Sequence, residues 1–181
     1  MAGVHRRVGV PEKILVVEDE QDLRELVGKY FGDMGYQVVV AADGADALDL
    51  AKEERPQIIL LDLRMPELDG LEICKKLKAD PTTKTIPIII VTAYNNQLNE
   101  ALAAGADDFV AKPVHLLELS LRVKSILKVR HLTDELEKSV AYMKEFQKNL
   151  PGVDTGHWRR LAHAQAAAPK AARKGRKSTK H

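Results

Sequence analysis

Five short apolar segments alternate with five helical segments along the chain, and this alternation limits the fold more than any other feature of the sequence. The segments typical of strands are 13–17, 36–41, 57–62, 86–92 and 108–111. Apolar residues recur at intervals of three and four in the segments that follow them, which predicts helices at 22–34, 43–54, 68–79, 97–104 and from near 115 onward. Strands that alternate with helices form a parallel sheet with helices on both faces, so we expect a doubly wound α/β fold.

The composition of the strands indicates their places in the sheet. Residues 14–17, 58–61 and 88–91 are apolar without interruption, which is typical of central strands buried on both faces. Segment 36–41 is also apolar, but as the second strand of the chain we expect it to flank the central ones.

The last predicted helix is much longer than the others and carries a second pattern. Apolar residues recur along it at heptad-like spacing, interrupted by polar Thr133 and Gln147, and Pro151–Gly152 ends it. The positions of this seam are Ile126, Val129, Thr133, Leu136, Val140, Met143, Gln147 and Leu150. The pattern favours a coiled coil, and the alternative is an amphipathic helix that folds back on its own domain.

These patterns divide the chain of 181 residues into four parts. We expect a flexible leader at 1–12, an α/β domain at 13–130, an extended helix at 131–150 and a disordered basic tail at 151–181.

Charge is distributed unevenly between the body and the tail. Eight of the 28 basic residues lie after Asp154, where the chain has no acidic residue, so residues 155–181 carry +8. Residues 1–154, with 20 basic and 26 acidic residues, carry −6. One hypothesis is that the tail binds nucleic acid. If the chain binds DNA in a salt-dependent way, and if this binding is lost when residues 155–181 are deleted, the hypothesis would be supported. The alternative is a solvated tail, and no helix-turn-helix follows the α/β domain.

Other features of the sequence bear on the cellular compartment of the protein. The single cysteine, Cys74, allows no disulfide within the chain, which is typical of a reducing compartment. No run approaches about 18 consecutive apolar residues, so we expect no membrane insertion. The first residues lack the apolar segment of a secretory signal. We therefore expect a cytoplasmic protein.

Polar side chains gather where the predicted strands end. Glu18 and Asp19 follow the first strand, Asp62 ends the third, Thr92 ends the fourth and Lys112 follows the fifth. Ligand sites of open parallel sheets form at this edge. Converging carboxylates repel one another unless a hard cation such as Mg²⁺ binds them. An aspartate nucleophile, a lysine and a hydroxyl would then form a site that accepts a phosphoryl group.

The segments 16–20, 61–70, 91–93 and 111–113, in this order, resemble the motifs of the receiver domain of two-component response regulators. They read Val-Val-Glu-Asp-Glu, Leu-Asp-Leu-Arg-Met-Pro-Glu-Leu-Asp-Gly, Val-Thr-Ala and Ala-Lys-Pro. The resemblance runs from about residue 13 to 129. It implies a flavodoxin-like sheet of five parallel strands in the order 2-1-3-4-5 with five helices.

The resemblance also implies roles for individual residues. Asp62 would be the phosphoacceptor, with Thr92 and Lys112 holding phosphoryl oxygens and small Ala93 leaving access. Mg²⁺ would be bound by the Asp19 and Asp62 carboxylates, by Glu18 through water and by the backbone carbonyl of Arg64. The family commonly has Asp-Asp where this chain has Glu18–Asp19.

Thr92 and Phe109 would form the switch, although Phe109 can equally be a core residue, and Pro113 would follow a cis peptide bond. The implied partners are a sensor histidine kinase or phosphotransfer protein, an unknown downstream protein and a second copy of the chain.

Two enzyme classes on parallel sheets fit the sequence less well. A phosphatase of the haloacid-dehalogenase type would need a second aspartate two residues after Asp62, where this chain has Arg64. A flavodoxin-type flavin binder would need a hydroxyl-rich loop at the position of residues 18–20. We therefore expect no enzyme activity beyond self-phosphorylation and self-dephosphorylation. We also expect Glu20 in the first turn of a helix, Asp69–Gly70 in a capping turn and Cys74 in the core.

Overall fold

A computed structural model describes residues 11–65, 69–93 and 98–149 of the chain. Within them strands and helices alternate as predicted. In chain order they are β1 (Lys13–Val17), α1 (Gln21–Asp33), β2 (Gln37–Ala41), α2 (Gly44–Glu54), β3 (Ile58–Asp62), α3 (Gly70–Ala79), β4 (Ile88–Thr92), α4 (Leu98–Ala103), β5 (Asp108–Ala111) and α5 (Leu116–Asn149).

Several predictions fall outside the described residues. They are most of the leader, the predicted starts of the third and fourth helices at 68 and 97, the last seam residue Leu150, the helix end at Pro151–Gly152 and the basic tail.

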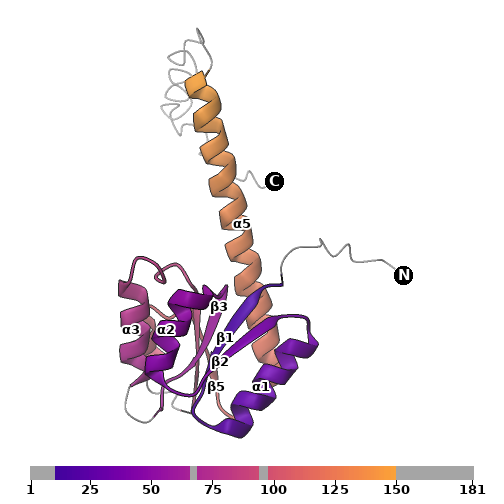
Figure 1. Cartoon of the computed structure of the whole chain (residues 1–181), viewed down its shortest axis with the longest axis vertical. Helices are drawn as coiled ribbons and strands as arrows, with labels where there is room; N and C mark the ends of the chain where they lie inside the picture. The colour runs from indigo at the N-terminus through magenta and orange to yellow at the C-terminus, as the bar shows by residue number, and fades with distance from the viewer. Residues whose placement is uncertain (1–10, 66–68, 94–97, 150–181) are drawn as a thin grey trace, which may run out of the picture. The chain divides into compact units, whose positions relative to one another are not determined.

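The five strands form one parallel sheet in the order β2-β1-β3-β4-β5, which confirms the predicted order. Every residue of β3 and β4 is buried, whereas β2 has exposed residues, Gln37 among them, and lies at the edge of the sheet. The uninterrupted apolar strands are therefore the central ones, because both of their faces are covered (Figure 1).

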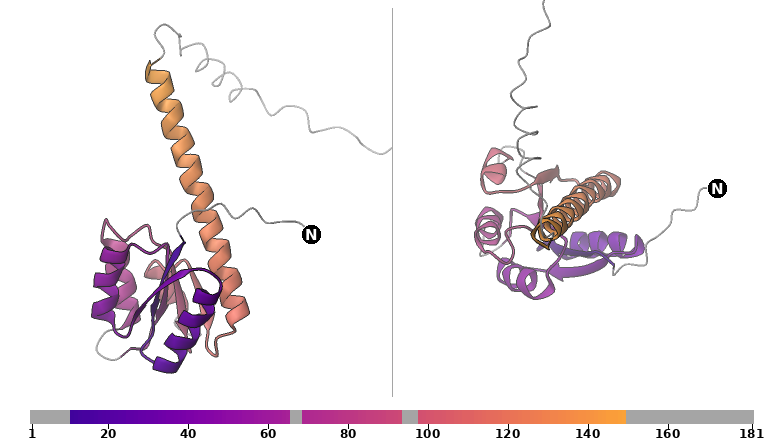
Figure 2. Two further views of the ribbon diagram at one scale, coloured as in Figure 1. Left: turned by 45° about the vertical axis from the view of Figure 1, so that its right-hand side comes forward. Right: turned by 90° about the horizontal axis from the view of Figure 1, so that it is seen from above.

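Alternate residues of each central strand point to two separate cores. Leu15, Ile59 and Ile90 face the core formed with α2, α3 and α4. Ile14, Leu60 and Val91 face the core formed with α1 and the first part of α5. Figure 2 shows these two groups of helices on opposite sides of the sheet. This two-residue alternation is the ordinary geometry of a strand, so the apolar residues of a central strand supply both cores.

The long helix α5 contributes to the core only in its first turns. Leu119, Val123 and Leu127 are buried, and Ile126 packs against the same core. Ile126 was predicted as the first member of the coiled-coil seam; that placement is wrong, because residues three and four apart share one face of a helix. Arg130 then donates from Nη1 to the carbonyl of Gln57 at 2.7 Å.

The chain divides after Thr133 into two units. In the second unit the structure describes only the end of α5, where residues 134–146 and Lys148 are all exposed. The coiled coil, the fold-back alternative and the predicted domain boundaries stay predictions. No helix in the described part of the chain is long and apolar enough to cross a membrane.

Short polar residues start two of the helices. Asp43 caps α2 by accepting from the amide of Asp46 at 2.9 Å, and Asp69 caps α3 by accepting from the amide of Leu71 at 2.9 Å. The capping role predicted for Asp69–Gly70 is confirmed. Glu20 was predicted in the first turn of α1. It lies just before that turn, at the cap position, and makes no capping hydrogen bond.

Gly70 is required where α3 passes the end of β3. A Cβ at this position would collide with the backbone carbonyl of Asp62 and with Cα of Leu63. Because both are backbone atoms, they cannot move aside without displacing the end of β3.

We expect Gly70→Ala to lower the free energy of unfolding by about 1–3 kcal/mol, as overpacking does. Gly32→Ala is the matched control, since a Cβ on Gly32 in α1 meets nothing within 4 Å. That variant should be neutral or more stable by up to about 1 kcal/mol. Urea unfolding of the three proteins makes the comparison, and equal stabilities would contradict the predicted collision.

Cys74 of α3 is fully buried, as predicted, and burial raises the pKa of its thiol to about 11. The thiolate is the reactive form of cysteine. We therefore expect iodoacetamide at pH 8 to label Cys74 roughly 100-fold more slowly in the folded chain than in denaturant. A cysteine placed at exposed Ala141 should label equally fast in both conditions. Fast labelling of native Cys74 would mean that α3 opens readily.

Candidate functional site

The carboxyl ends of the parallel strands bring four predicted residues to one edge of the sheet. Glu18 follows β1, Asp62 ends β3, Thr92 ends β4 and Lys112 follows β5. The side chains of Glu18, Asp62 and Thr92 are almost completely buried, and Lys112 is largely buried. Parallel strands all end at the same edge, so residues that are 94 positions apart in the chain become neighbours here.

Lys112 lies between the two buried carboxylates. Its Nζ donates to Oδ2 of Asp62 at 2.7 Å and to Oε1 of Glu18 at 2.9 Å. Burial alone would lower the pKa of Lys112, but the hydrogen bonds to Asp62 and Glu18 outweigh it and leave that pKa raised. The ammonium is therefore charged at neutral pH and offsets part of the negative charge at this edge.

Glu18 shows that this compensation is incomplete. Burial raises the pKa of Glu18, the hydrogen bond from Lys112 opposes this effect, and the neighbouring charge of Asp62 raises the pKa further. A carboxylate whose pKa is raised in this way carries its charge at a cost. A second cation at the site would remove that cost.

The carboxylates are placed to hold such a cation. Oxygens of Glu18, Asp19 and Asp62 all lie within 4.8 Å of one another, and Asp19 is exposed. Three hard oxygen donors with one open side suit a divalent cation that keeps some of its water, as Mg²⁺ does. The donor set therefore fits a metal ion, and the predicted ligands Glu18, Asp19 and Asp62 are brought together.

Two residues that the sequence analysis did not assign to the site support this cluster. Nη1 of Arg24 in α1 donates to the backbone carbonyls of Glu18 at 2.8 Å and of Asp19 at 3.1 Å. Gly70 permits the close approach of α3 to the backbone of Asp62. In the sequence Arg24 looks like any charge on a helix, because only the fold brings its guanidinium back onto the preceding loop.

The remaining predicted residues surround the cluster in different ways. The amide of Arg64 donates to Oδ1 of Asp62 at 3.1 Å, and the amide of Lys112 donates to the carbonyl of Thr92 at 2.8 Å. The peptide bond between Lys112 and Pro113 is cis, as the resemblance implies. Ala93 is exposed. The metal-binding role of the Arg64 carbonyl stays a prediction.

Phe109 lies on β5, the strand that Lys112 of the cluster follows. It is half-buried on β5, pairs with Ile90 of β4 and packs against the core shared with α2, α3 and α4. Its packing fits both readings from the sequence, a switch residue and a core residue.

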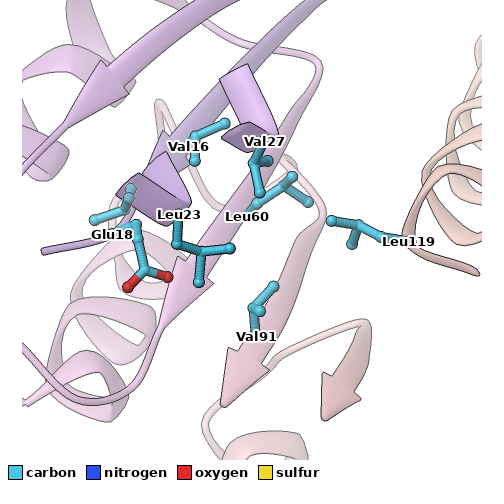
Figure 3. Close-up of a pocket in the computed structure, with 8 residues that line it drawn as sticks. Val16, Glu18, Leu23, Val27, Leu60, Val91 and Leu119 are labelled. Carbon is cyan, nitrogen blue, oxygen red and sulfur yellow. The ribbon is translucent and has the colours of Figure 1, made fainter. Parts of the chain in front are cut away.

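A small cavity lies behind the cluster, between the sheet, α1 and α5. Its volume is about 10 Å³, and it is lined by Val16, Leu23, Leu60, Val91, Leu119 and other apolar side chains (Figure 3). Glu18 is its one charged lining residue. The cavity has room for about one water and none for an organic substrate. An organic substrate therefore does not fit in this cavity.

Comparisons with known proteins agree with this geometry. The response regulator receiver domain family matches residues 14–124. Response regulator PleD of Caulobacter vibrioides is 41% identical over 132 residues, which cover 71% of this chain and 29% of PleD. Response regulator MprA of Mycolicibacterium vanbaalenii is 41% identical over 122 residues, which cover 66% of this chain and 52% of MprA. The chain thus spans about half or less of these curated relatives.

Solved structures show the same fold. Chemotaxis response regulator CheY4 of Vibrio cholerae superimposes with a TM-score of 0.62 at 30% identity, over 65% of this chain and 99% of CheY4. The receiver domain of sensor histidine kinase PA1611 from Pseudomonas aeruginosa, whose active site cleft coordinates a magnesium ion, gives a TM-score of 0.61 at 30% identity, over 66% of this chain and 99% of that domain. Since the family match spans more than half of the chain and coincides with the unit that carries the acidic cluster, the chain belongs to the response regulator receiver domains of two-component systems.

Proposed function

We propose that the chain is a phosphorylation switch that accepts a phosphoryl group on Asp62 with the help of Mg²⁺. The observation that carries this proposal is the pairing of buried Asp62 with Lys112 at 2.7 Å inside an acidic cluster that fits a metal ion. The ammonium of Lys112 offsets the buried negative charge of Asp62, and the carboxylate of Asp62 is the proposed nucleophile. The magnesium ion in the related receiver domain from Pseudomonas aeruginosa supports the choice of metal.

The proposed reaction moves a phosphoryl group from a phosphohistidine to Asp62. A carboxylate oxygen of Asp62 attacks phosphorus, the bond between phosphorus and the imidazole nitrogen breaks, and the imidazole leaves with the electron pair of that bond. Glu18, Asp19 and Asp62 would hold Mg²⁺, which when bound neutralises charge on the phosphoryl oxygens. Lys112 is within reach of a phosphoryl oxygen on Asp62, and the Thr92 hydroxyl would donate to another.

The same step would change a surface elsewhere on the domain. We propose that Thr92 moves toward the phosphoryl group and that Phe109 shifts into the space released. Two features support this coupling: Thr92 pairs with Ala111 of β5, two residues from Phe109, and Phe109 is only half-buried. The affected surface would comprise α4, β5 and the start of α5. A local charge would thus bias a two-state element.

The proposed partners follow from this role. A sensor histidine kinase or phosphotransfer protein donates the phosphoryl group, a downstream protein reads the changed surface, and a second copy of the chain is a further partner. We propose that the chain has no other chemistry than gain and loss of its own phosphoryl group, and that it acts in the cytoplasm.

Intact mass spectrometry tests the proposed phosphoacceptor. Incubation with acetyl phosphate and Mg²⁺ should add one phosphoryl group, ~80 Da, through an acyl phosphate. We expect no addition for Asp62→Asn or in the presence of EDTA. Asp33→Asn is the matched control, because Asp33 ends α1 at the opposite edge of the sheet, and it should be labelled like the wild type. A wild-type chain that is labelled neither by acetyl phosphate nor by a panel of histidine kinases would refute the switch.

Calorimetric titration with Mg²⁺ tests the cluster separately from phosphorylation. Asp19→Asn should weaken binding at least tenfold, about 1.4 kcal/mol, because one of three carboxylates is lost. Arg24→Ala should also weaken binding, because the loop that carries Glu18 and Asp19 loses its anchor. Charge alone predicts the reverse for Arg24→Ala, since removing a nearby cation favours Mg²⁺. Tighter binding by that variant would show that Arg24 does not position the ligands, and Asp33→Asn again serves as control.

A further inference from the structure

Helix α5 carries a row of large apolar side chains that the fold leaves exposed. They are 42% to 65% exposed, which is unusual for residues of this kind. We call this row the α5 seam; its members are Val129, Leu132, Leu136, Val140, Met143 and Phe146. Phe146 also stacks on exposed Tyr142, with ring centroids 6.3 Å apart.

The seam does not continue the face by which α5 packs on the sheet. With about 100° between successive residues of a helix, the six members fall within an arc of about 120°. The buried residues Leu119, Val123 and Leu127 fall on the other side of the helix axis. The apolar side chains after Val129 therefore serve a contact other than the core of the domain.

Charged residues are excluded from the seam. From residue 130 to 148 all but one of the charged side chains fall in the arc opposite the seam, and the exception, Glu135, lies at its border. The opposite arc holds Arg130, Asp134, Glu137, Lys138, Lys144, Glu145 and Lys148. A helix that pairs with another helix typically has an apolar stripe with few charged residues at its borders and many charged residues on the opposite face.

The spacing of the apolar residues indicates that the partner of α5 is a helix with the same repeat. Val129, Leu132, Leu136, Met143 and Phe146 of the seam fall at the core positions of the heptad repeat of a left-handed coiled coil, with polar Ser139 at the remaining core position and Val140 beside it. In this register Leu132, Ser139 and Phe146 take the places that Thr133, Val140 and Gln147 hold in the seam predicted from the sequence. Two such helices place no pair of like charges directly across the contact.

The exposed area is sufficient for association of two copies. A half-exposed large apolar side chain presents on the order of 100 Å². Six of them on each copy would bury about 1,200 Å² in total, the lower end of the range for stable protein–protein interfaces.

We propose that the α5 seam binds the α5 seam of a second copy of this chain and makes the protein a dimer. Since the contact lies outside the acidic cluster, dimerisation does not require phosphorylation of Asp62. The unphosphorylated chain is therefore the protein to test.

Light scattering coupled to size exclusion measures the dimer directly. The full chain should have twice the monomer mass of 20.1 kDa. Leu136→Glu should reduce the mass to that of the monomer, because a charge then lies within the seam. Ala141→Glu is the matched control: Ala141 is exposed on the charged face of the same helix, so this variant should stay dimeric. Circular dichroism checks that both variants keep their helix.

Oxidative crosslinking identifies the contacting face. Native Cys74 is buried, so an introduced cysteine dominates disulfide formation. Ser139→Cys, at the heptad core position between Leu136 and Met143, should form a disulfide-linked dimer in a parallel pair. In an antiparallel pair that overlaps over Val129 to Phe146, it should crosslink with Leu136→Cys of a second copy. Ala141→Cys should not crosslink.

Several results would overturn the proposal. One is a chain that stays monomeric at concentrations up to about 100 µM, which exceed the dissociation constants of most specific complexes. The seam would then bind another part of the chain or another protein. Another is a dimer that both glutamate variants leave intact, since the contact would lie elsewhere. A wild type that dimerises but is not labelled on Asp62 would refute the switch and leave the dimer in place.

Discussion

The hydrogen-bonded ion pairs of Lys112 with Asp62 and Glu18 are the interactions on which the site depends. They join the ends of β1, β3 and β5 and allow two carboxylates to lie buried next to each other. Removing the lysine would leave both charges in a poorly solvated place, which is among the costlier changes in a protein. The compensation is partial, since the pKa of Glu18 remains raised. This imbalance suits the site to a divalent cation, and a bound cation together with Lys112 would offset the negative charge of the phosphoryl group proposed for Asp62.

The packing of the sheet holds the residues of the site in place. Its central strands are buried on both faces, so the strand ends cannot shift without disturbing two cores. Arg24 fixes the loop after β1, and Gly70 lets α3 pass directly over the end of β3. The apolar cavity behind Glu18 is too small for an organic substrate. This agrees with the proposal that another protein presents the phosphoryl group to Asp62.

Helix α5 has two different functions along its length. Its first turns complete the core of the domain through Leu119 and Val123, and Arg130 anchors it to the carbonyl of Gln57. Beyond that anchor its large apolar residues are exposed and form the seam that we propose binds a second copy of the chain. In that proposal one helix is part of both the receiver domain and the dimer contact.

Much of this protein was determined by its sequence alone. Strands and helices are set by local periodicity and composition, so their order, the central strands and the polar residues at the strand ends could be predicted. The tertiary structure decided which of these residues meet. Lys112 contacts Glu18 as well as Asp62, Arg24 turns back onto the loop before it, and Ile126 belongs to the core and not to the seam. These facts depend on how the crossovers and the helix α5 pack on the sheet, and contacts between residues far apart in the chain leave no periodic signal in the sequence.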